Sequence, residues 1–556
     1  MLIKAIVLMV IASLSTVVLD TGTSSAQVPA ALRGQVSSAE EGAMEGVLVS
    51  AKKQGSNITV TVVSNAQGRY QFPATKLEPG RHSIAVRAVG YDLQGPTEVA
   101  ISADRPTTAD LTLQKTKNLA AQLTNAEWLE SMPGAPDQKL FLQNCTSCHS
   151  LQLPLYSVHD SAAFVEVQKR MALYAAGSSP LLPQKLVAQR VSNQGEFALA
   201  RRADLLKSQA EFLASVNLSE GPKWSYALKT FARPTGRATR VIITQYDLPQ
   251  ETRMPHDVIV AKDGTVWYDS FAEQILGKLD PKTGKIIEYV VPTLKPNSPK
   301  GSLALRADED GNLWLGMSYQ AGIARFDPTA ETFKTFPLPP QLNKDYTQTT
   351  EVEPSHAKVD GKVWIEDSGT YSIYRLDLAS GQFEVFQPFP IPSVNIYDIA
   401  SDRDNNVYFT VYGRNDIGRI DAKTGQIAIF PTPSKNSAPR RGTLDADGKN
   451  MWFGEFRANK VGVFNTNTKT IREWTPPTPW FFPYDVSPDR NGEAWTGSML
   501  TDRVARLDPK TGQFTEYLLP TSTNIRRTFV DDSTTPVTFW AGSNHGHAIV
   551  KLEPLD

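Results

Sequence analysis

The sequence predicts a mainly β protein in which a seven-bladed β-propeller follows a small helical domain and an N-terminal β-sandwich. Three observations support this prediction. Short apolar runs alternate with turns rich in the 36 Gly and 38 Pro, which favours many short strands. An aromatic residue recurs about every 45 residues in the C-terminal half, which is typical of repeated four-stranded units. A helical pattern surrounds the only two cysteines.

The charge balance excludes some partners. The 556 residues contain 57 Lys and Arg against 58 Asp and Glu, a formal net charge of -1. No overall positive field is therefore present to hold nucleic acid, and we expect no nucleic-acid partner.

Residues 1–26 have the pattern of a signal peptide. Lys4 precedes the apolar run 5–19, and the small residues Ser24, Ser25 and Ala26 follow it. The alternative is an uncleaved anchor, but the run is shorter than the roughly 20 residues of a spanning helix. We expect cleavage after Ala26, a periplasmic or secreted product, and no transmembrane segment in it.

Residues 31–116 alternate apolar and polar positions in short runs, which predicts a small β-sandwich. Its turns contain Gly34-Gln35-Val36, Gly68-Arg69-Tyr70, Leu77-Glu78-Pro79-Gly80 and Gly90-Tyr91. With these motifs the segment resembles the carboxypeptidase regulatory-like family. The resemblance implies an accessory structural or adhesive role and no peptidase activity.

The two cysteines stand in the motif Cys145-Thr146-Ser147-Cys148-His149. At this spacing two thiols form thioether bonds to a haem, and the adjacent His reaches its iron. A thioredoxin-like redox pair and half of a zinc site are the alternatives. The motif predicts covalent haem c in a cytochrome c-like domain over residues 118–220.

The sixth ligand of the iron is a separate question. An amphipathic helix over 161–174 carries Met171, whose thioether would raise the reduction potential of the haem. Met171 is otherwise a core residue, as methionine usually is. His159 is the rival ligand or an exposed loop residue, and an open position is the third alternative.

Residues 241–556 repeat with a recurring aromatic, which predicts the seven blades. The strand signal 242–246 precedes the first blade, so we expect it to pair with the last strand and close the ring. The recurring aromatics are Trp267, Trp314, Trp364, Tyr408, Trp452, Trp495 and Trp540.

Several motifs of this region carry a further likeness. They are Pro255-His256-Asp257, Trp452-Phe453-Gly454-Glu455, Asn459-Lys460-Val461-Gly462, Leu279-Asp280-Pro281-Lys282-Thr283-Gly284 and Leu507-Asp508-Pro509-Lys510-Thr511-Gly512. With them the region resembles the streptogramin (virginiamycin B) lyase family. The resemblance implies a magnesium ion and a histidine base that open a cyclic ester by elimination at one mouth of the ring.

In that family one blade supplies Glu-x-His and a later Trp-x-x-Glu, and the preceding blade supplies another His. Blade three offers Glu353 and His356, one residue wider, with Asp367 three residues after Trp364. The preceding blade has Leu303 at the corresponding place. The resemblance thus makes His356, Glu353 and His256 the catalytic candidates and implies magnesium or calcium in the propeller.

The same alignment predicts which residues line the mouth. A cationic and aromatic rim of this kind suits an anionic or planar ligand, or the edge of a neighbouring haem. The alternative is that these side chains are polar because a central channel is wet. His545 and His547 follow Trp540 in a Gly-rich loop and are further candidates. The expected rim is His256, Leu303, His356, Tyr397, Arg440, Tyr484 and Arg526.

These elements favour an exported monohaem cytochrome. We expect electron transfer with a redox partner protein, or haem-linked oxidation of a small organic substrate at the mouth. The alternatives are a lyase and a non-catalytic binding scaffold, since a propeller alone does not identify chemistry.

Overall fold

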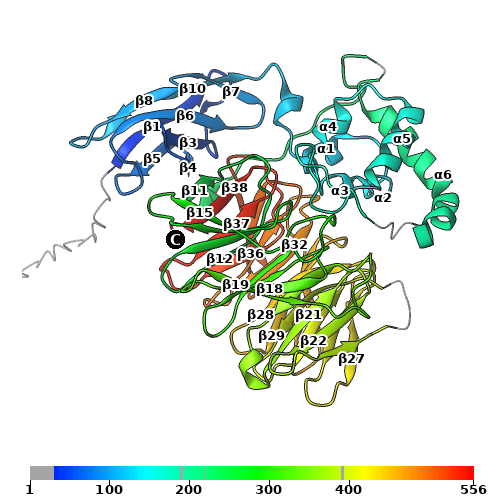
Figure 1. Cartoon of the computed structure of the whole chain (residues 1–556). Coiled ribbons are helices and arrows are strands. Elements are labelled where there is room, and N and C mark those ends of the chain that lie inside the picture. The colour runs from blue at the N-terminus through cyan, green and yellow to red at the C-terminus, as the bar shows by residue number, and fades with distance from the viewer. Residues whose placement is uncertain (1–29, 188–191, 220, 390–393) are drawn as a thin grey trace, which may run out of the picture.

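A computed structural model describes residues 30–187, 192–219, 221–389 and 394–556. The predicted signal peptide lies outside the described residues. A β-sandwich and a helical region lie next to a larger propeller-like body built of four-stranded sheets (Figure 1). Among the described residues, none of the helices combines the length and the apolar character that a membrane crossing requires.

The N-terminal domain is a sandwich of two sheets, as predicted. One sheet has the order β2-β1-β10-β7, with β5 and β9 also paired to β1, and the other contains β4-β3-β6-β8. Its strands are β1 (Ala30–Ser38), β2 (Gly42–Ala43), β3 (Leu48–Lys53), β4 (Ile58–Val63), β5 (Arg69–Pro73), β6 (Gly80–Arg87), β7 (Tyr91–Gly95), β8 (Glu98–Ile101), β9 (Thr107–Thr108) and β10 (Leu111–Lys115).

The helical region follows directly. Its first α-helix begins with a capping box in which Thr124 and Glu127 bond each other's backbone N–H groups. The predicted amphipathic helix is present and ends at Met171. The helices are η1 (Leu119–Gln122), α1 (Asn125–Ser131), α2 (Pro136–Lys139), α3 (Leu142–Cys145), α4 (Gln152–Leu155), α5 (Ser161–Met171) and α6 (Ser192–Val216), and η2 (Gly236–Thr239) leads into the next domain.

The propeller-like body contains six separate four-stranded antiparallel sheets among the described residues, each ordered as its strands follow in the chain. They are β12 (Pro255–Val260), β13 (Val266–Ser270), β14 (Ile275–Leu279) and β15 (Ile286–Val290); β16 (Ala304–Ala307), β17 (Leu313–Gly316), β18 (Gly322–Asp327) and β19 (Thr332–Pro337); β20 (Thr349–Glu353), β21 (Lys362–Asp367), β22 (Ser372–Asp377) and β23 (Phe383–Phe386); β24 (Ile396–Ser401), β25 (Val407–Val411), β26 (Asp416–Ile420) and β27 (Ile427–Pro431); β28 (Pro439–Leu444), β29 (Asn450–Glu455), β30 (Lys460–Asn465) and β31 (Ile471–Trp474); and β32 (Pro483–Pro488), β33 (Ala494–Ser498), β34 (Arg503–Asp508) and β35 (Gln513–Leu518). A short helix, η3 (Ala357–Val359), joins β20 to β21.

A further set of four strands joins the two ends of this body. It consists of β36 (Thr528–Asp531), β37 (Thr538–Ser543), β38 (Ala548–Pro554) and β11 (Val241–Asp247). β11 pairs antiparallel with β38, with Tyr246 opposite Ile549. The predicted pairing of the strand at 242–246 with the last strand is thus confirmed.

The other edge of β11 is also occupied. It pairs antiparallel with β4 of the sandwich, with Thr244 opposite Val60, so one sheet of eight strands runs through both domains. This continuity covers an edge that would otherwise expose unpaired backbone groups. The sequence carries no sign of it.

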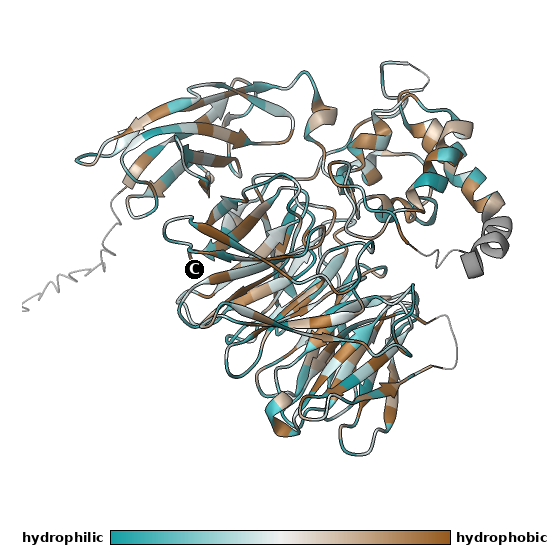
Figure 2. Cartoon of the chain, viewed as in Figure 1, coloured by the Kyte–Doolittle hydropathy of each residue, from teal (hydrophilic) through white to brown (hydrophobic). Residues whose placement is uncertain are grey.

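The first strand of each set lies innermost. Each of these strands contacts the next around the body, and β36 contacts β12, so the succession closes. Apolar side chains between neighbouring sheets form the core, for example Trp364 against Ile399 and Phe409. Figure 2 shows hydrophobic residues along the strands and hydrophilic residues in many of the connecting turns.

Candidate functional site

The recurring aromatics set a common register for the innermost strands. Ile259, for example, lies opposite Trp267, and His256 stands three residues before Ile259. We call the residues at this position in all the sets the first ring. They are His256, Leu303, Thr350, Tyr397, Arg440, Tyr484 and Arg526.

One residue expected at the mouth is elsewhere. Thr350, not His356, holds the first-ring position of its set. His356 follows the C-terminal end of β20, and its Nδ1 lies 2.9 Å from the Oγ of Ser401, the last residue of β24. Tyr397 stands four residues before Ser401, about 13 Å along the strand at ~3.3 Å per residue. The prediction that His356 lines this mouth is therefore wrong.

Glu353 is also distant from the first ring. It is the last residue of β20, and its carboxylate pairs with Arg306 at 3.1 Å. The structure therefore places Glu353 and His356 toward one end of the innermost strands and His256 at the other. The three catalytic candidates do not form one site.

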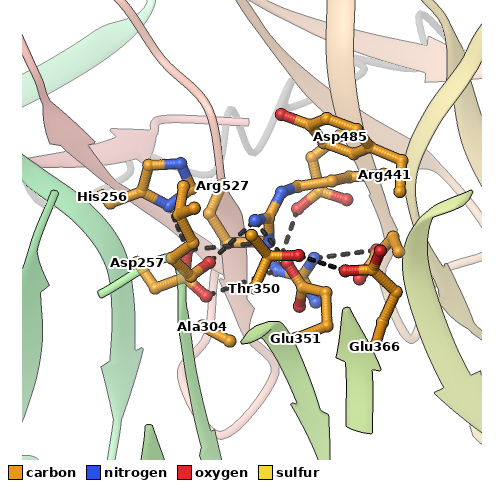
Figure 3. Close-up of polar contacts among 12 residues, drawn as sticks. His256, Asp257, Ala304, Thr350, Glu351, Glu366, Arg441, Asp485 and Arg527 are labelled. Carbon is orange, nitrogen blue, oxygen red and sulfur yellow. Dashed lines mark hydrogen bonds and ion pairs between the residues drawn. The ribbon is translucent and has the colours of Figure 1, made fainter. Parts of the chain in front are cut away.

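The next residue of each innermost strand belongs to a second ring, whose charged members form an ionic network (Figure 3). Arg527 Nη1 lies 2.9 Å from Asp398 Oδ2, and Arg441 pairs with Glu351. Arg306 adds a third guanidinium, 3.1 Å from Asp398. Buried charges need such partners. The second ring consists of Asp257, Ala304, Glu351, Asp398, Arg441, Asp485 and Arg527.

His256 is joined to this network. It is fully buried, and its Nδ1 lies 2.7 Å from Asp257 Oδ1, whereas its Nε2 has no hydrogen-bond partner. Because a carboxylate only accepts, Nδ1 carries the proton and Nε2 presents a lone pair. Burial lowers the pKa of His256 to about 3, so the ring is neutral.

Ligand atoms of His256, Asp257 and Asp269 lie within 4.8 Å of one another, a spacing that a metal ion requires. Arg441 and Arg527 approach Asp257 to 3.8 and 3.9 Å and already supply positive charge. Burial and the Asp257 charge raise the pKa of Asp269 to about 8, which keeps its carboxyl protonated at neutral pH. The two arginine charges oppose a divalent cation here, whereas His256 Nε2 and Asp269 Oδ2 are buried without a hydrogen-bond partner, and magnesium or calcium stays a prediction.

The first ring is cationic and aromatic. The hydroxyls of Tyr397 and Tyr484 bond each other. The guanidinium of Arg440 stacks 3.9 Å from the centre of the Tyr484 ring, and that of Arg526 lies 4.5 Å from the Phe271 ring. Burial opposes ionisation of Tyr484, but Arg440, Arg441 and Arg526 outweigh it and lower its pKa. The first ring thus places two guanidinium groups beside aromatic faces.

The Cys-x-x-Cys-His loop lies directly on this ring. Asn524 Nδ2 donates to the Thr146 carbonyl at 2.9 Å, and Arg526 Nη2 donates to the Ser147 carbonyl at 2.6 Å. Residues more than 370 positions apart in the chain therefore meet at the mouth. This contact brings the two motifs that the sequence singled out into one site.

Other parts of the helical region cover the mouth on further sides. The backbone N–H of Ala126 donates to Leu500 O at 2.9 Å. Opposite α1, the segment after α5 crosses to other sheets, where Ala176 N donates to the Tyr319 hydroxyl at 3.0 Å and Gln184 Nε2 donates to Ala272 O at 2.8 Å. The helical region thus contacts several sheets at the end of the body that carries the first ring.

The residues of the loop fit a covalently attached haem. Cys145 and Cys148 are free and lie on one turn, since the N–H of Cys148 donates to the Cys145 carbonyl. His149 Nδ1 donates to the Ser150 carbonyl at 2.9 Å, which leaves Nε2 free for iron. One apolar cluster surrounds the loop and combines Leu142 of α3 with Phe482 from the propeller-like body.

The alternative roles of the cysteines find less support. Burial raises the pKa of Cys145 to about 11, whereas a thioredoxin-like nucleophile needs a lowered pKa. Within the described ranges, no zinc-like cluster includes Cys145 or Cys148.

The candidate sixth ligands differ in position. Met171 ends α5 and is 40% exposed, and His159 is exposed beside the Phe164 ring. His545, in the turn between β37 and β38, is packed so that burial and Arg526 lower its pKa to about 3. His547 Nδ1 donates to Arg253 O at 2.9 Å. No contact decides between Met171 and His159, and the ligand stays a prediction.

The comparisons with known proteins concern two parts of the chain. Residues 296–554 match the virginiamycin B lyase family. Residues 31–114 match the carboxypeptidase regulatory-like domain, so both resemblances are confirmed. No curated protein compared with the chain matches it.

Three solved structures illustrate the likeness. A virginiamycin B lyase from Staphylococcus aureus is 24% identical, with a TM-score of 0.49 over 56% of this chain and 99% of that chain. A streptogramin B lyase is 24% identical, with a TM-score of 0.49 over 58% and 100%. The extracellular domain of a hybrid two-component system from B. thetaiotaomicron is 16% identical, with a TM-score of 0.42 over 55% and 38%.

The residues that the lyase family implies are not assembled at this mouth. In the propeller-like body, Trp-x-x-Glu occurs at Trp452 to Glu455. In that same set the first-ring residue is Arg440, with Ala438 two positions before it, where the family has Glu-x-His. The preceding set presents Tyr397 in place of His. The Glu-x-His pattern that the resemblance implies is therefore absent from this set.

Two parts of the site were missed by sequence reasoning. The second ring follows the first by one residue in every set, so the aromatic period contained a usable signal for it. Thr350 was missed because η3 lengthens the connection to Trp364 and shifts the count. Asn524 carries no motif, and its contact with Thr146 depends on how two domains pack.

Proposed function

We propose that the helical region carries a covalent haem and that the chain transfers electrons between this haem and a donor at the propeller mouth. In this proposal the seven four-stranded sets are the blades of a seven-bladed propeller, and export delivers the chain to the compartment where haem is attached. The observation that carries the proposal is the contact of the Cys-x-x-Cys-His loop with the propeller mouth, made by hydrogen bonds from Asn524 and Arg526.

Residues of the loop and of the first ring have different roles in this proposal. Cys145 and Cys148 would hold the haem, and His149 Nε2 would bind its iron. A haem bound there supplies a one-electron couple. Arg526 fixes the loop against the ring, and Tyr484 and Arg440 present a flat, positive surface to the donor. The donor loses one electron at the mouth, and a redox partner protein accepts that electron in turn.

The second candidate is a carbon–oxygen lyase, which the family match over 296–554 favours. An elimination base must reach the proton that it removes. His256 Nε2 is unpaired, but Arg440 and Tyr397 stand where the family places its base and a further His.

The test uses the full chain from a host that attaches haem to exported proteins. We expect a mass equal to polypeptide plus one haem, a haem stain that survives denaturation, and a spectrum that changes on reduction. The matched control is Cys145→Ser with Cys148→Ser, which should lose all three while the propeller remains folded. Polypeptide mass alone from the competent host would overturn the proposal.

A parallel assay addresses the lyase. The same protein is incubated with a streptogramin B-type cyclic ester and magnesium, and the products are separated by chromatography. We expect no ring-opened isomer. Its formation at a rate that His256→Ala abolishes would replace the proposed function with the lyase.

A further inference from the structure

The two rings treat their arginines differently. In the second ring, Arg441 and Arg527 each pair with carboxylates. In the first ring, neither Arg440 nor Arg526 forms an ion pair with any described residue. Neighbouring positions of the same strands thus differ in charge compensation.

A buried guanidinium without a carboxylate partner raises the free energy of the folded chain. Arg526 is 3% exposed, and it donates hydrogen bonds to two neutral oxygens, Asn524 Oδ1 and Ser147 O. Burial and the nearby charge of Arg440 lower the pKa of Arg526. Removing a cation from water costs several kcal/mol, and two like charges side by side add to this cost.

Arg440 likewise has no carboxylate partner among the described residues. Burial opposes its ionisation, but Tyr397, Tyr484 and Tyr412 outweigh burial and raise its pKa. Its Nε is buried without a hydrogen-bond partner, and its Nη1 lies 3.6 Å from the Met499 sulfur. Rings of Tyr397, Phe456 and Tyr484 enclose the guanidinium and leave its fork without a carboxylate. A planar fork of this kind matches a carboxylate better than a single neutral acceptor.

We propose that Arg440 and Arg526 together bind a carboxylate group beside Tyr484, between the first ring and the Cys-x-x-Cys-His loop. The carboxylate belongs either to a small organic donor or to the propionates of the haem itself. The proposal deepens the proposed function, and it rests on that function only for the identity of the carboxylate's source.

The test is calorimetric titration of the full haem-loaded chain with benzoate at low ionic strength, with neutral benzamide as the matched probe. We expect one saturable benzoate site and binding of benzamide at least about tenfold weaker. Arg440→Gln and Arg526→Gln should each weaken benzoate about tenfold or more. Arg457→Gln, an exposed arginine near the same rim, should leave it unchanged.

Loss of folding is separated from loss of the site by a second variant. Arg440→Lys keeps the charge but not the fork, so benzoate affinity should fall between those of the wild type and Arg440→Gln. A circular dichroism spectrum of each variant verifies its fold.

A second arm distinguishes the two sources. If the haem propionates occupy the site, the loaded chain does not bind benzoate, the Cys145→Ser/Cys148→Ser chain does, and Arg526→Gln changes the reduction potential of the loaded chain. Absence of benzoate binding in both chains, with unchanged potentials in the arginine variants, would overturn the proposal. Benzoate binding to a chain that proves to carry no haem would retain the site and reject only the proposed function.

Discussion

Arg526 of the first ring donates a 2.6 Å hydrogen bond to the carbonyl of Ser147, between the two cysteines of the Cys-x-x-Cys-His loop. The side chain is almost wholly buried, so this contact is made away from competing water. It joins the propeller-like body to a loop of the helical region that is 379 positions away in the chain. A change of charge at Cys148 therefore acts directly on Arg526.

The sixth ligand can be identified by substitution. We expect Met171→Ala to lower the reduction potential or to yield high-spin iron, because a thioether ligand stabilises the reduced state. Absorption spectra and a redox titration measure the change. His159→Ala is the matched control and should leave both unchanged. The reverse pattern would assign the ligand to His159.

The cover over the mouth can be loosened at Gly177. This residue has φ +89°, and an added Cβ would lie 2.2 Å from the Phe271 carbonyl oxygen. We expect Gly177→Ala to push the segment after α5 away from the mouth and to increase hydrogen exchange in residues 172–186. It should also speed reduction of the haem by a small reagent.

The matched control separates backbone strain from the clash. Gly264 has φ +84° but no atom within 4 Å of an added Cβ. Gly264→Ala therefore carries a similar conformational cost without touching the cover. Equal hydrogen exchange in residues 172–186 for both variants would contradict close packing of Gly177 against Phe271.

Much of the propeller-like body could be predicted from its aromatic period, because each Trp fills the same core position of a repeated unit. β11 was found for the same reason, as the last unit lacked one strand. The pairing of β11 with β4 could not be found, because an exposed strand edge carries no mark of its partner. Thr350 could not be found by counting back from Trp364, because the turn of helix at η3 lengthens the connection between β20 and β21.

The second ring should contribute strongly to stability. Arg441 is 1% exposed and pairs with Glu351 and, at 3.8 Å, with Asp257. We expect Arg441→Met to destabilise the fold by about 3–5 kcal/mol, because it leaves buried carboxylates unpaired. Urea unfolding followed by tryptophan fluorescence measures this change. Lys449→Ala, which breaks an exposed pair with Asp447, should not shift the midpoint.

The carboxyl of Glu366 should make stability fall as pH rises. It is fully buried, and burial raises its pKa well above the ordinary 4.5, although the Thr350 and Ser368 hydroxyls bond it and oppose the shift (Figure 3). Above pH 4.5 the unfolded chain releases this proton while the folded chain retains it. The folded state then binds more protons, so the free energy of unfolding decreases with pH.

Glu366→Gln removes this proton and keeps the shape of the side chain. We expect the variant to gain stability relative to the wild type steadily from about pH 4.5 upward, as measured by urea midpoints at several pH values. For Glu384→Gln we expect the opposite change of stability with pH. Burial opposes ionisation of Glu384, but Lys362 and Arg375 lower its pKa. The free energy of unfolding of the wild type therefore increases relative to that of Glu384→Gln as pH rises toward 4.5, and the difference persists above pH 4.5. Parallel curves for Glu366→Gln and the wild type would show that Glu366 is ionised in the folded chain, and the carboxyl beside Thr350 would then need a cation.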